Sequence, residues 1–258
     1  NISFLLCAKK LFLYFSKSFA WLFISWTQDL AHKLSQQKFT SKLMTPLTII
    51  DVFFAPEQIL KNSNLNDVYF PGLETKLKSK GIIYAYTPRF LGGKSALLYY
   101  KMFRQLKSKN IPVLSSFQLL NLFDYFKMLV FILVYPWRVF RQIKKLGSSR
   151  EDKFLKLFLW DAMSHTSVKN YARQLFGEHI SKLNVTSIKC ISWYENQPQD
   201  KNFYKGLRFK SQKVQIYGAQ LFPWPANILN LHTDERDNNF GLVPDYILVN
   251  GIYFLKND

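Results

Sequence analysis

Short apolar runs alternate with amphipathic stretches from residue 45 onward, and this alternation is the strongest constraint on the fold. The apolar runs are rich in β-branched and aromatic residues. The stretches between them repeat apolar residues every three or four positions, as amphipathic helices do. Strands that alternate with helices form a parallel sheet covered by helices on both faces. We therefore expect an α/β, Rossmann-like fold with a largely parallel sheet.

The apolar runs predict strands, several of which are expected to share one sheet. These runs occupy residues 46–56, 82–88, 111–117, 185–194, 213–220 and 245–251. The strands of the sheet are expected near residues 82–87, 112–116, 187–194, 214–217 and 246–250. The intervening stretches predict helices within residues 66–81, 93–110, 119–145 (with an interruption near Pro136), 150–183 (as one or two helices) and 198–208.

The pattern divides the chain into three parts. Residues 1–44 lack the alternation and predict an appended helical region that could lie at a membrane interface. Residues 45–244 predict the Rossmann-like domain, and residues 245–258 predict either its last strand or the start of a truncated second domain. The sequence begins without Met and stops just after an apolar run, so we expect a fragment or a truncated sequence.

The charge balance indicates a polyanionic partner. Lys and Arg number 35 against 17 Asp and Glu, which gives a net charge of +18. Such a surplus favours nucleic acid, an anionic membrane or a phosphorylated substrate as partner. A codon bias toward Lys, Asn and Phe explains the same composition without any partner. Cys7 and Cys190 form no closely spaced pair, so neither a disulfide framework nor a metal site is expected, and a reducing, cytoplasmic setting fits best.

Two apolar segments raise the question of a membrane. The first, residues 1–26, is interrupted by lysines and matches neither a spanning helix nor a signal peptide. The second runs uncharged from Met128 to Trp137 and is followed by Arg138, Arg141, Lys144 and Lys145. Three interpretations are open for this second segment: a core helix with a solvated basic end, an interfacial helix on anionic lipid, or a true span.

Polar residues follow two consecutive predicted strands. Glu195, Asn196 and Gln197 follow the strand at 185–194, and Gln220 ends the next strand. The carboxyl ends of parallel strands meet at one edge of the sheet, where open α/β folds bind ligands. Glu195 could act as a general base, hold a substrate hydroxyl or cap the following helix. Asn196 and Gln197 could bind sugar or phosphate oxygens, or form the turn.

A long irregular segment, residues 217–245, supplies a second candidate. It contains His232, whose imidazole is the best titratable group for catalysis near neutral pH, although a structural role is equally open. Common nucleotide and metal motifs are missing from the sequence: it contains neither a GxxxxGK[ST] phosphate loop, nor a GxGxxG fingerprint, nor an HExxH pair.

Three segments together resemble one family. The runs "WYENQPQDKNFYKGLR", "IYGAQLF" and "FGLVPDYILVNG", with the earlier "NDVYFPGLETKLKSKG", are similar to bacterial surface-carbohydrate biosynthesis proteins of the GT-B glycosyltransferase type. The chain departs from several relatives at Leu221, where they carry His. The matching residues are Asp67, Gly72, Tyr194, Glu195, Gln197, Pro198, Gly218, Gln220, Pro244, Asp245, Asn250 and Gly251.

The resemblance implies the amino-terminal, acceptor-side domain of such an enzyme, peripheral on the inner face of the cell membrane. The activity it implies is transfer of a sugar from a nucleotide-sugar donor to a glycan or lipid-linked acceptor, without a tightly bound cofactor. From the resemblance together with the residue patterns above, we expect Glu195 and His232 to be catalytic, and Asn196, Gln197, Gly218, Gln220 and Asn250 to bind substrate. The basic residues after Trp137 would contact an anionic membrane surface. One alternative is a basic module that binds nucleic acid or another polyanion, although no nucleic-acid motif supports nucleic-acid binding. A second alternative is a catalytically inactive remnant.

Overall fold

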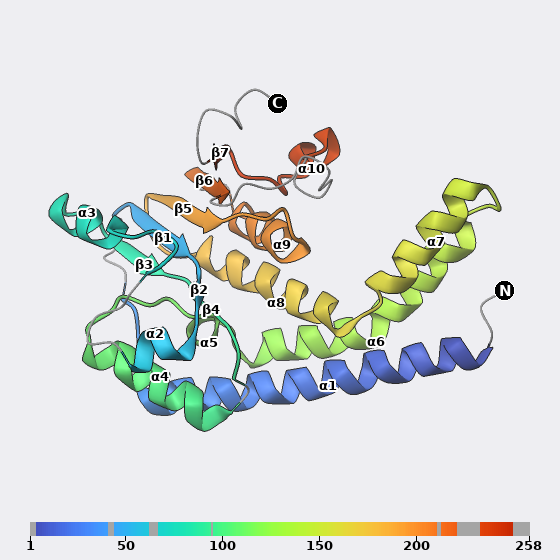
Figure 1. The fold of residues 1–258 in the computed structure, drawn as a ribbon, viewed down its shortest axis with the longest axis horizontal. Helices are drawn as coiled ribbons and strands as arrows, with labels where there is room; N and C mark the ends of the chain where they lie inside the picture. Colours follow the sequence, from blue (N-terminus) through green and yellow to red (C-terminus); the bar gives the residue numbers. More distant parts are fainter. Residues whose placement is uncertain are drawn as a thin grey trace. The chain divides into compact units, whose positions relative to one another are not determined.

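The computed structural model describes residues 4–40, 44–61, 67–93, 95–210, 213–220 and 233–249 (Figure 1). The chain divides into two compact units. Unit 1 combines Asn1–Thr27 with Asn121–Ala172, and unit 2 combines Gln28–Leu120 with Arg173–Asp258. The boundaries predicted after residues 44 and 244 stay predictions.

Unit 2 is built on a five-stranded sheet in which every strand pairs in parallel with its neighbours, so the expected α/β, Rossmann-like fold is confirmed. The strand order is β3-β1-β5-β6-β7. Every residue of β1 is buried, as expected for a central strand covered on both faces. The strands are β1 (Leu47–Asp51), β3 (Tyr84–Tyr86), β5 (Ser187–Trp193), β6 (Lys213–Gln220) and β7 (Tyr246–Val249).

The strand expected at 112–116 is reduced to a single bridge beside β3, and β1, which the expected sheet did not include, lies between β3 and β5. Val113 makes only an isolated parallel bridge to Tyr86. The Ser115 hydroxyl then accepts a hydrogen bond from the Gln118 backbone amide and starts the short helix α5 (Ser116–Leu119). This cap turns the backbone out of the extended conformation. The run at 46–56 also divides, because β2 (Phe53–Phe54) pairs with β4 (Arg89–Phe90) in a separate two-stranded sheet.

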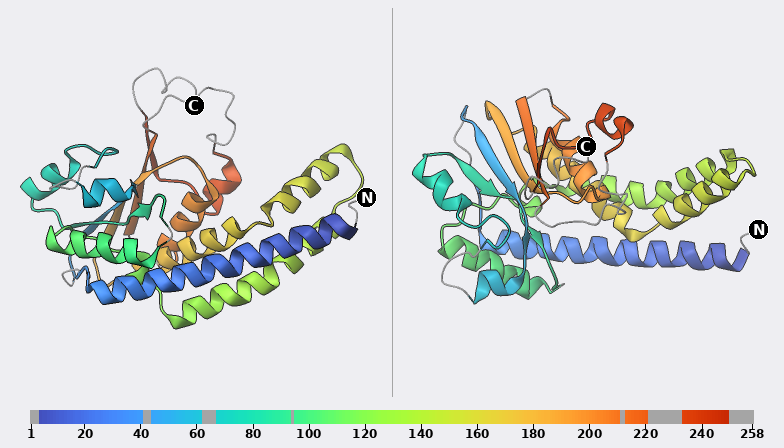
Figure 2. Two further views of the ribbon diagram at one scale, coloured as in Figure 1. Left: turned by 60° about the horizontal axis from the view of Figure 1, so that its bottom comes forward. Right: turned by 45° about the horizontal axis from the view of Figure 1, so that its top comes forward.

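Helices cover both faces of the sheet (Figure 2). Neighbouring residues of a strand point to opposite faces. Accordingly, Ile50 joins one core cluster with Phe103, and Ile49 joins the other with Phe203. The helices of this unit are α2 (Pro56–Leu60), α3 (Leu73–Ser79), α4 (Ala96–Ser108), α5, α9 (Pro198–Leu207), α10 (Glu235–Asn239) and parts of α1 (Phe4–Ser35) and α8 (His165–Ile180).

Two glycines allow α8 and α9 to pack closely. A Cβ atom at Gly206 would lie 2.2 Å from the Gln174 carbonyl oxygen, and one at Gly177 would lie 2.6 Å from the Phe203 carbonyl oxygen. No larger residue fits at either position unless the backbones separate. This contact fixes α9, and therefore the loop that precedes it, against α8.

Unit 1 contains the first part of α1, together with α6 (Leu122–Lys145), α7 (Arg150–Ala162) and the start of α8. The interruption expected at Pro136 is absent, since α6 continues through this residue. A proline inside a helix removes one backbone hydrogen bond, and the buried Ile132, Pro136 and Val139 keep this stretch packed. Across the described residues, none of the helices combines the length and apolarity that a membrane crossing requires.

Candidate active site at the carboxyl edge of the sheet

The order of the strands reverses at one point in the sheet. From β1 the chain proceeds to β3 on one side, then crosses to β5, β6 and β7 on the other. Counted along the chain, the sheet has the order 2-1-3-4-5, and doubly wound sheets bind ligands where such an order reverses. The reversal here lies between β1 and β5. Asp51 ends β1 and Trp193 ends β5, so both residues mark the carboxyl edge of the sheet at this point.

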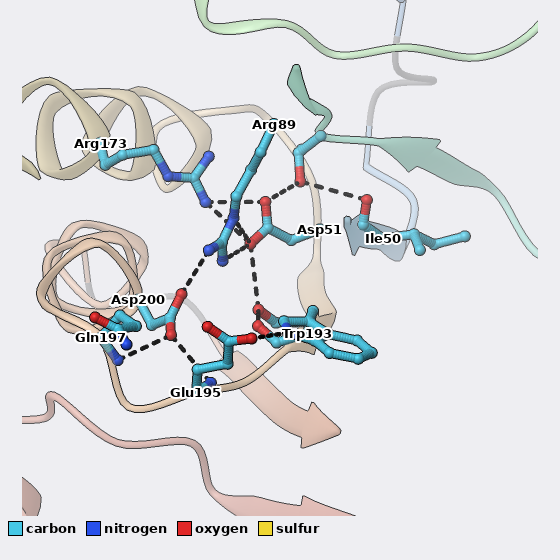
Figure 3. A network of polar contacts seen from close by, with 10 residues as sticks. Ile50, Asp51, Arg89, Arg173, Trp193, Glu195, Gln197 and Asp200 are labelled. Atoms are coloured by element: carbon cyan, nitrogen blue, oxygen red, sulfur yellow. Dashed lines mark hydrogen bonds and ion pairs between the residues drawn. The ribbon is translucent and has the colours of Figure 1, made fainter. Parts of the chain in front are cut away.

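A buried network of charges occupies this edge (Figure 3). The Asp51 carboxylate has no exposed surface and accepts hydrogen bonds from Arg173 Nη2 at 2.9 and 3.0 Å and from Arg89 Nε at 3.0 Å. The hydroxyls of Thr87 and Ser192 each donate to the same carboxylate at 3.2 Å. A buried carboxylate is stable only with such partners.

Arg89 extends the network to a second carboxylate. Its Nη1 atom lies 2.6 Å from Asp200 Oδ1, and its guanidinium lies 5.0 Å from the centroid of the Phe53 ring. Arg173 similarly lies 4.0 Å from the Phe203 ring centroid. The buried Arg89 and the partly buried Arg173 therefore face two buried carboxylates, which satisfies the requirement that interior charges be paired.

The network shifts the pKa of Asp51. Burial by itself raises the pKa of this carboxyl, but the positive charges of Arg173 and Arg89 outweigh burial and hold the pKa below its usual value. Burial also lowers the pKa of the Arg173 guanidinium, which Asp51 partly compensates. The ionised form of Asp51 is thus the one that the folded protein stabilises.

Asp200 connects this network to the loop between β5 and α9. Its Oδ2 atom accepts hydrogen bonds from the backbone amides of Glu195 at 3.2 Å and Gln197 at 3.1 Å. Between them, Asn196 takes the left-handed backbone conformation with φ of 53°, which Asn tolerates better than most residues. The conformation of the Glu195–Gln197 loop is therefore fixed by a buried carboxylate that Arg89 links to Asp51.

Glu195 itself is partly exposed and does not cap α9, because Gln197 occupies the cap position and its backbone amide donates to Asp200. The Glu195 carboxylate accepts a hydrogen bond from Trp193 Nε1 at 2.8 Å. The Trp193 ring in turn meets the Tyr69 ring edge to face, with centroids 4.7 Å apart. Burial, with a smaller contribution from the Glu195 charge, raises the pKa of Tyr69. A carboxylate held in this way can accept a proton from a bound hydroxyl.

The other predicted site residues fall into three groups. Gln197 occupies the cap position of α9, and Gln220 ends β6, where the pairing of Trp193 with Ala219 brings both loops to the same edge of the sheet. Gly218 is explained by packing, because a Cβ atom there would lie 2.9 Å from the Tyr194 side chain and 2.8 Å from that of Pro244. His232 and Asn250 lie outside the described residues.

Asp67 and Gly72, two residues of the family-like motif that lie away from the carboxyl edge of the sheet, have clear local roles. Asp67 Oδ1 accepts hydrogen bonds from the backbone amides of Tyr69 at 2.9 Å and Phe70 at 3.0 Å, and so positions the Tyr69 ring. Gly72 begins α3 with φ of 77°, which glycine adopts without strain. The predicted membrane-surface residues lie in unit 1, exposed on α6: Arg138, Arg141, Lys144 and Lys145.

Neither a protein-family model, nor a curated protein, nor a solved structure matches the chain. What makes this edge a candidate active site is therefore its geometry. A partly exposed carboxylate lies at the switch point of a parallel α/β sheet, and a buried network of ion pairs supports it.

Proposed function

We propose that this chain is the acceptor-side part of a glycosyltransferase of the GT-B type in bacterial surface polysaccharide or lipopolysaccharide biosynthesis. It would transfer a sugar from a nucleotide-sugar donor to a glycan or lipid-linked acceptor. The observation that carries the proposal is the position of the Glu195 carboxylate, which follows the carboxyl end of β5 beside the point where the strand order reverses, the place where doubly wound sheets usually bind ligands. The motif resemblance of residues 193–251 supports the same activity.

In this mechanism Glu195 acts as the general base. Trp193 Nε1 orients the carboxylate through one oxygen, and the acceptor hydroxyl gives its proton to the carboxylate. The acceptor oxygen then forms a bond to the anomeric carbon of the donor sugar, while the bond from that carbon to the nucleotide phosphate breaks and the nucleotide leaves. Asp200 is a positioning residue, because it holds the backbone amide of Glu195.

The proposed setting is the inner face of the cell membrane. Arg138, Arg141, Lys144 and Lys145 are exposed near the end of α6, and cations near an anionic leaflet contribute about 1 kcal/mol each. A lipid-linked acceptor would be presented at this surface.

A transfer assay tests the proposal. The protein is incubated with a lipid extract of bacterial membranes and, in turn, with labelled UDP-, GDP-, CMP- and dTDP-sugars. The proposal predicts nucleotide release together with label in the lipid or glycan fraction for at least one donor. A protein that releases nucleotide from none of these donors, but binds DNA or RNA with a steep dependence on salt, is a polyanion-binding module instead.

A further inference from the structure

Unit 1 contains an apolar groove that the proposed transfer reaction does not use. The groove lies between α1 and α6 and has a volume of about 890 Å³. The Tyr125 hydroxyl donates to the Ser25 carbonyl oxygen at 3.3 Å, which connects the two helices beside the groove. The side chains that form its walls are almost wholly aromatic or aliphatic, among them Phe19, Phe23, Trp26, Leu122, Phe123 and Phe126.

These side chains are exposed to a degree that is unusual for large apolar residues. The exposed fraction is 80% for Leu122, 64% for Phe23 and 63% for Phe123. A single exposed apolar residue is ordinary, but a contiguous group of this kind marks an interaction surface.

The apolar surface continues along one face of α6. Leu122, Phe126, Val130, Leu133 and Trp137 follow one another at intervals of three or four residues, and all are exposed. The next positions on the same face are Arg141 and Lys144. An exposed apolar stripe therefore ends in cations, as in helices that lie in the plane of a membrane interface.

All the exposed charges on these two helices are positive within the described part of unit 1. Residues 4–27 of α1 carry Lys9, Lys10 and Lys17 but no carboxylate. The one carboxylate of α6, Asp124, is 1% exposed and belongs to the helix cap. At the groove, the Lys127 ammonium lies 4.8 Å from the centroid of the Phe123 ring. Any partner of this surface must therefore combine apolar material with negative charge.

We propose that the α1–α6 groove and the apolar face of α6 insert into the hydrocarbon of an anionic lipid leaflet. This inference deepens the proposed function and rests on it only for the choice of a membrane-linked acceptor. A second copy of the chain fits poorly, since unit 1 has twelve Lys and Arg against four Asp and Glu, and two such surfaces repel. Nucleic acid would leave the aliphatic side chains without partners.

Vesicle partitioning tests the insertion. The full chain and a variant with Phe23→Ser and Phe126→Ser are sedimented with vesicles of phosphatidylcholine and phosphatidylglycerol, at low salt and at about 0.5 M NaCl, where charge attraction is screened. The variant is expected to partition at least about tenfold more weakly at both salt concentrations, because burial of apolar surface is not screened. The matched control, Phe209→Ser with Phe240→Ser, removes two phenylalanines of similar exposure from unit 2 and should partition like the unsubstituted chain.

A second measurement does not depend on the stability of that variant. Vesicles with bromine on the acyl chains should quench the tryptophan fluorescence of the unsubstituted chain more strongly than that of the Trp26→Phe variant, because Trp26 lies in the groove. Equal partitioning of the groove variant and the unsubstituted chain would overturn the inference, and so would a dimer that the groove substitutions dissociate. Both results leave transfer at Glu195 standing, whereas a Glu195 variant that keeps full transfer would contradict the proposed function and leave the insertion standing.

Discussion

The Asp200 carboxylate accepts a hydrogen bond from the backbone amide of Glu195 at 3.2 Å. This bond joins a fully buried residue to a partly exposed one across the start of α9. Since Asp200 is also paired with Arg89, and Arg89 with Asp51, the end of β1 is connected to the loop after β5. The loop that carries the proposed base is therefore held to the core by hydrogen bonds and ion pairs.

The first prediction concerns Asp51. Asp51→Asn leaves Arg89 and Arg173 facing a neutral amide in the interior, and unpairing a buried charge costs about 3–5 kcal/mol of unfolding free energy. The matched control is Asp234→Asn, which changes an exposed cap of α10 to a residue that caps equally well. Urea unfolding of both variants measures the difference. Equal stability of the two variants would show that the ion pairs contribute nothing net.

The second prediction concerns the stability of the protein at acidic pH. The pKa of Asp51 is depressed in the folded state, so its contribution to stability is present above its unfolded pKa of about 3.9 and is lost as the pH falls through the folded value. Unfolding free energy should therefore drop below about pH 4, and drop less steeply in Asp51→Asn. Urea titrations at about pH 6, 4 and 3 give the slopes. Parallel slopes for the two proteins would contradict the depressed pKa.

The third prediction concerns the contact between α8 and α9. Gly206→Ala places a methyl group where only 2.2 Å separates it from the Gln174 carbonyl oxygen. Overpacking of this kind costs about 1–3 kcal/mol, which exceeds the gain in helix propensity of about 1 kcal/mol. Gly147→Ala is the control, because its nearest neighbour is the end of the Asp152 side chain, which can move. A melting temperature for Gly206→Ala at or above that of Gly147→Ala would mean that the helices separate freely.

Local patterns in the sequence predicted the elements around the site closely. The strand expected at 213–220 is β6, residue for residue, and α9 begins at the expected Pro198. The strand expected at 112–116 shrinks to one bridge at Val113, because the Ser115 hydroxyl accepts a hydrogen bond from the Gln118 backbone amide and starts a helix. A strand or helix propensity that extends over several residues can be predicted from the sequence more easily than a single side-chain hydrogen bond.

The ion-pair network was not predicted. Its partners lie far apart in the sequence: Asp51 and Arg89 are separated by 38 positions, and Asp51 and Arg173 by 122. The signal that was available is the carboxylate inside the apolar run "LTIIDVFF", because a buried charge requires a partner. That signal indicates a partner without identifying it, since only the fold brings Arg89 and Arg173 to the same edge.

The fourth prediction concerns the end of α6. Replacing Arg138, Arg141, Lys144 and Lys145 with Gln should weaken binding to anionic vesicles by a few kcal/mol, at about 1 kcal/mol per charge, because all four are exposed. This loss should shrink at high salt, unlike the loss caused by removing groove phenylalanines. Vesicle co-sedimentation at two salt concentrations measures it. Binding that does not change would make these residues an ordinary solvated helix end.

Transfer by Glu195→Gln tests the central claim most directly. Gln is nearly isosteric and can still accept the Trp193 hydrogen bond, so thermal unfolding should be unchanged. Without a base, sugar transfer per folded molecule should fall by about 100-fold or more. The control is Glu235→Gln, which alters an exposed carboxylate in the first turn of α10 and should leave both quantities unchanged. Transfer by Glu195→Gln at the rate of the unsubstituted protein, measured on the same preparation as its melting temperature, would contradict a catalytic role for Glu195.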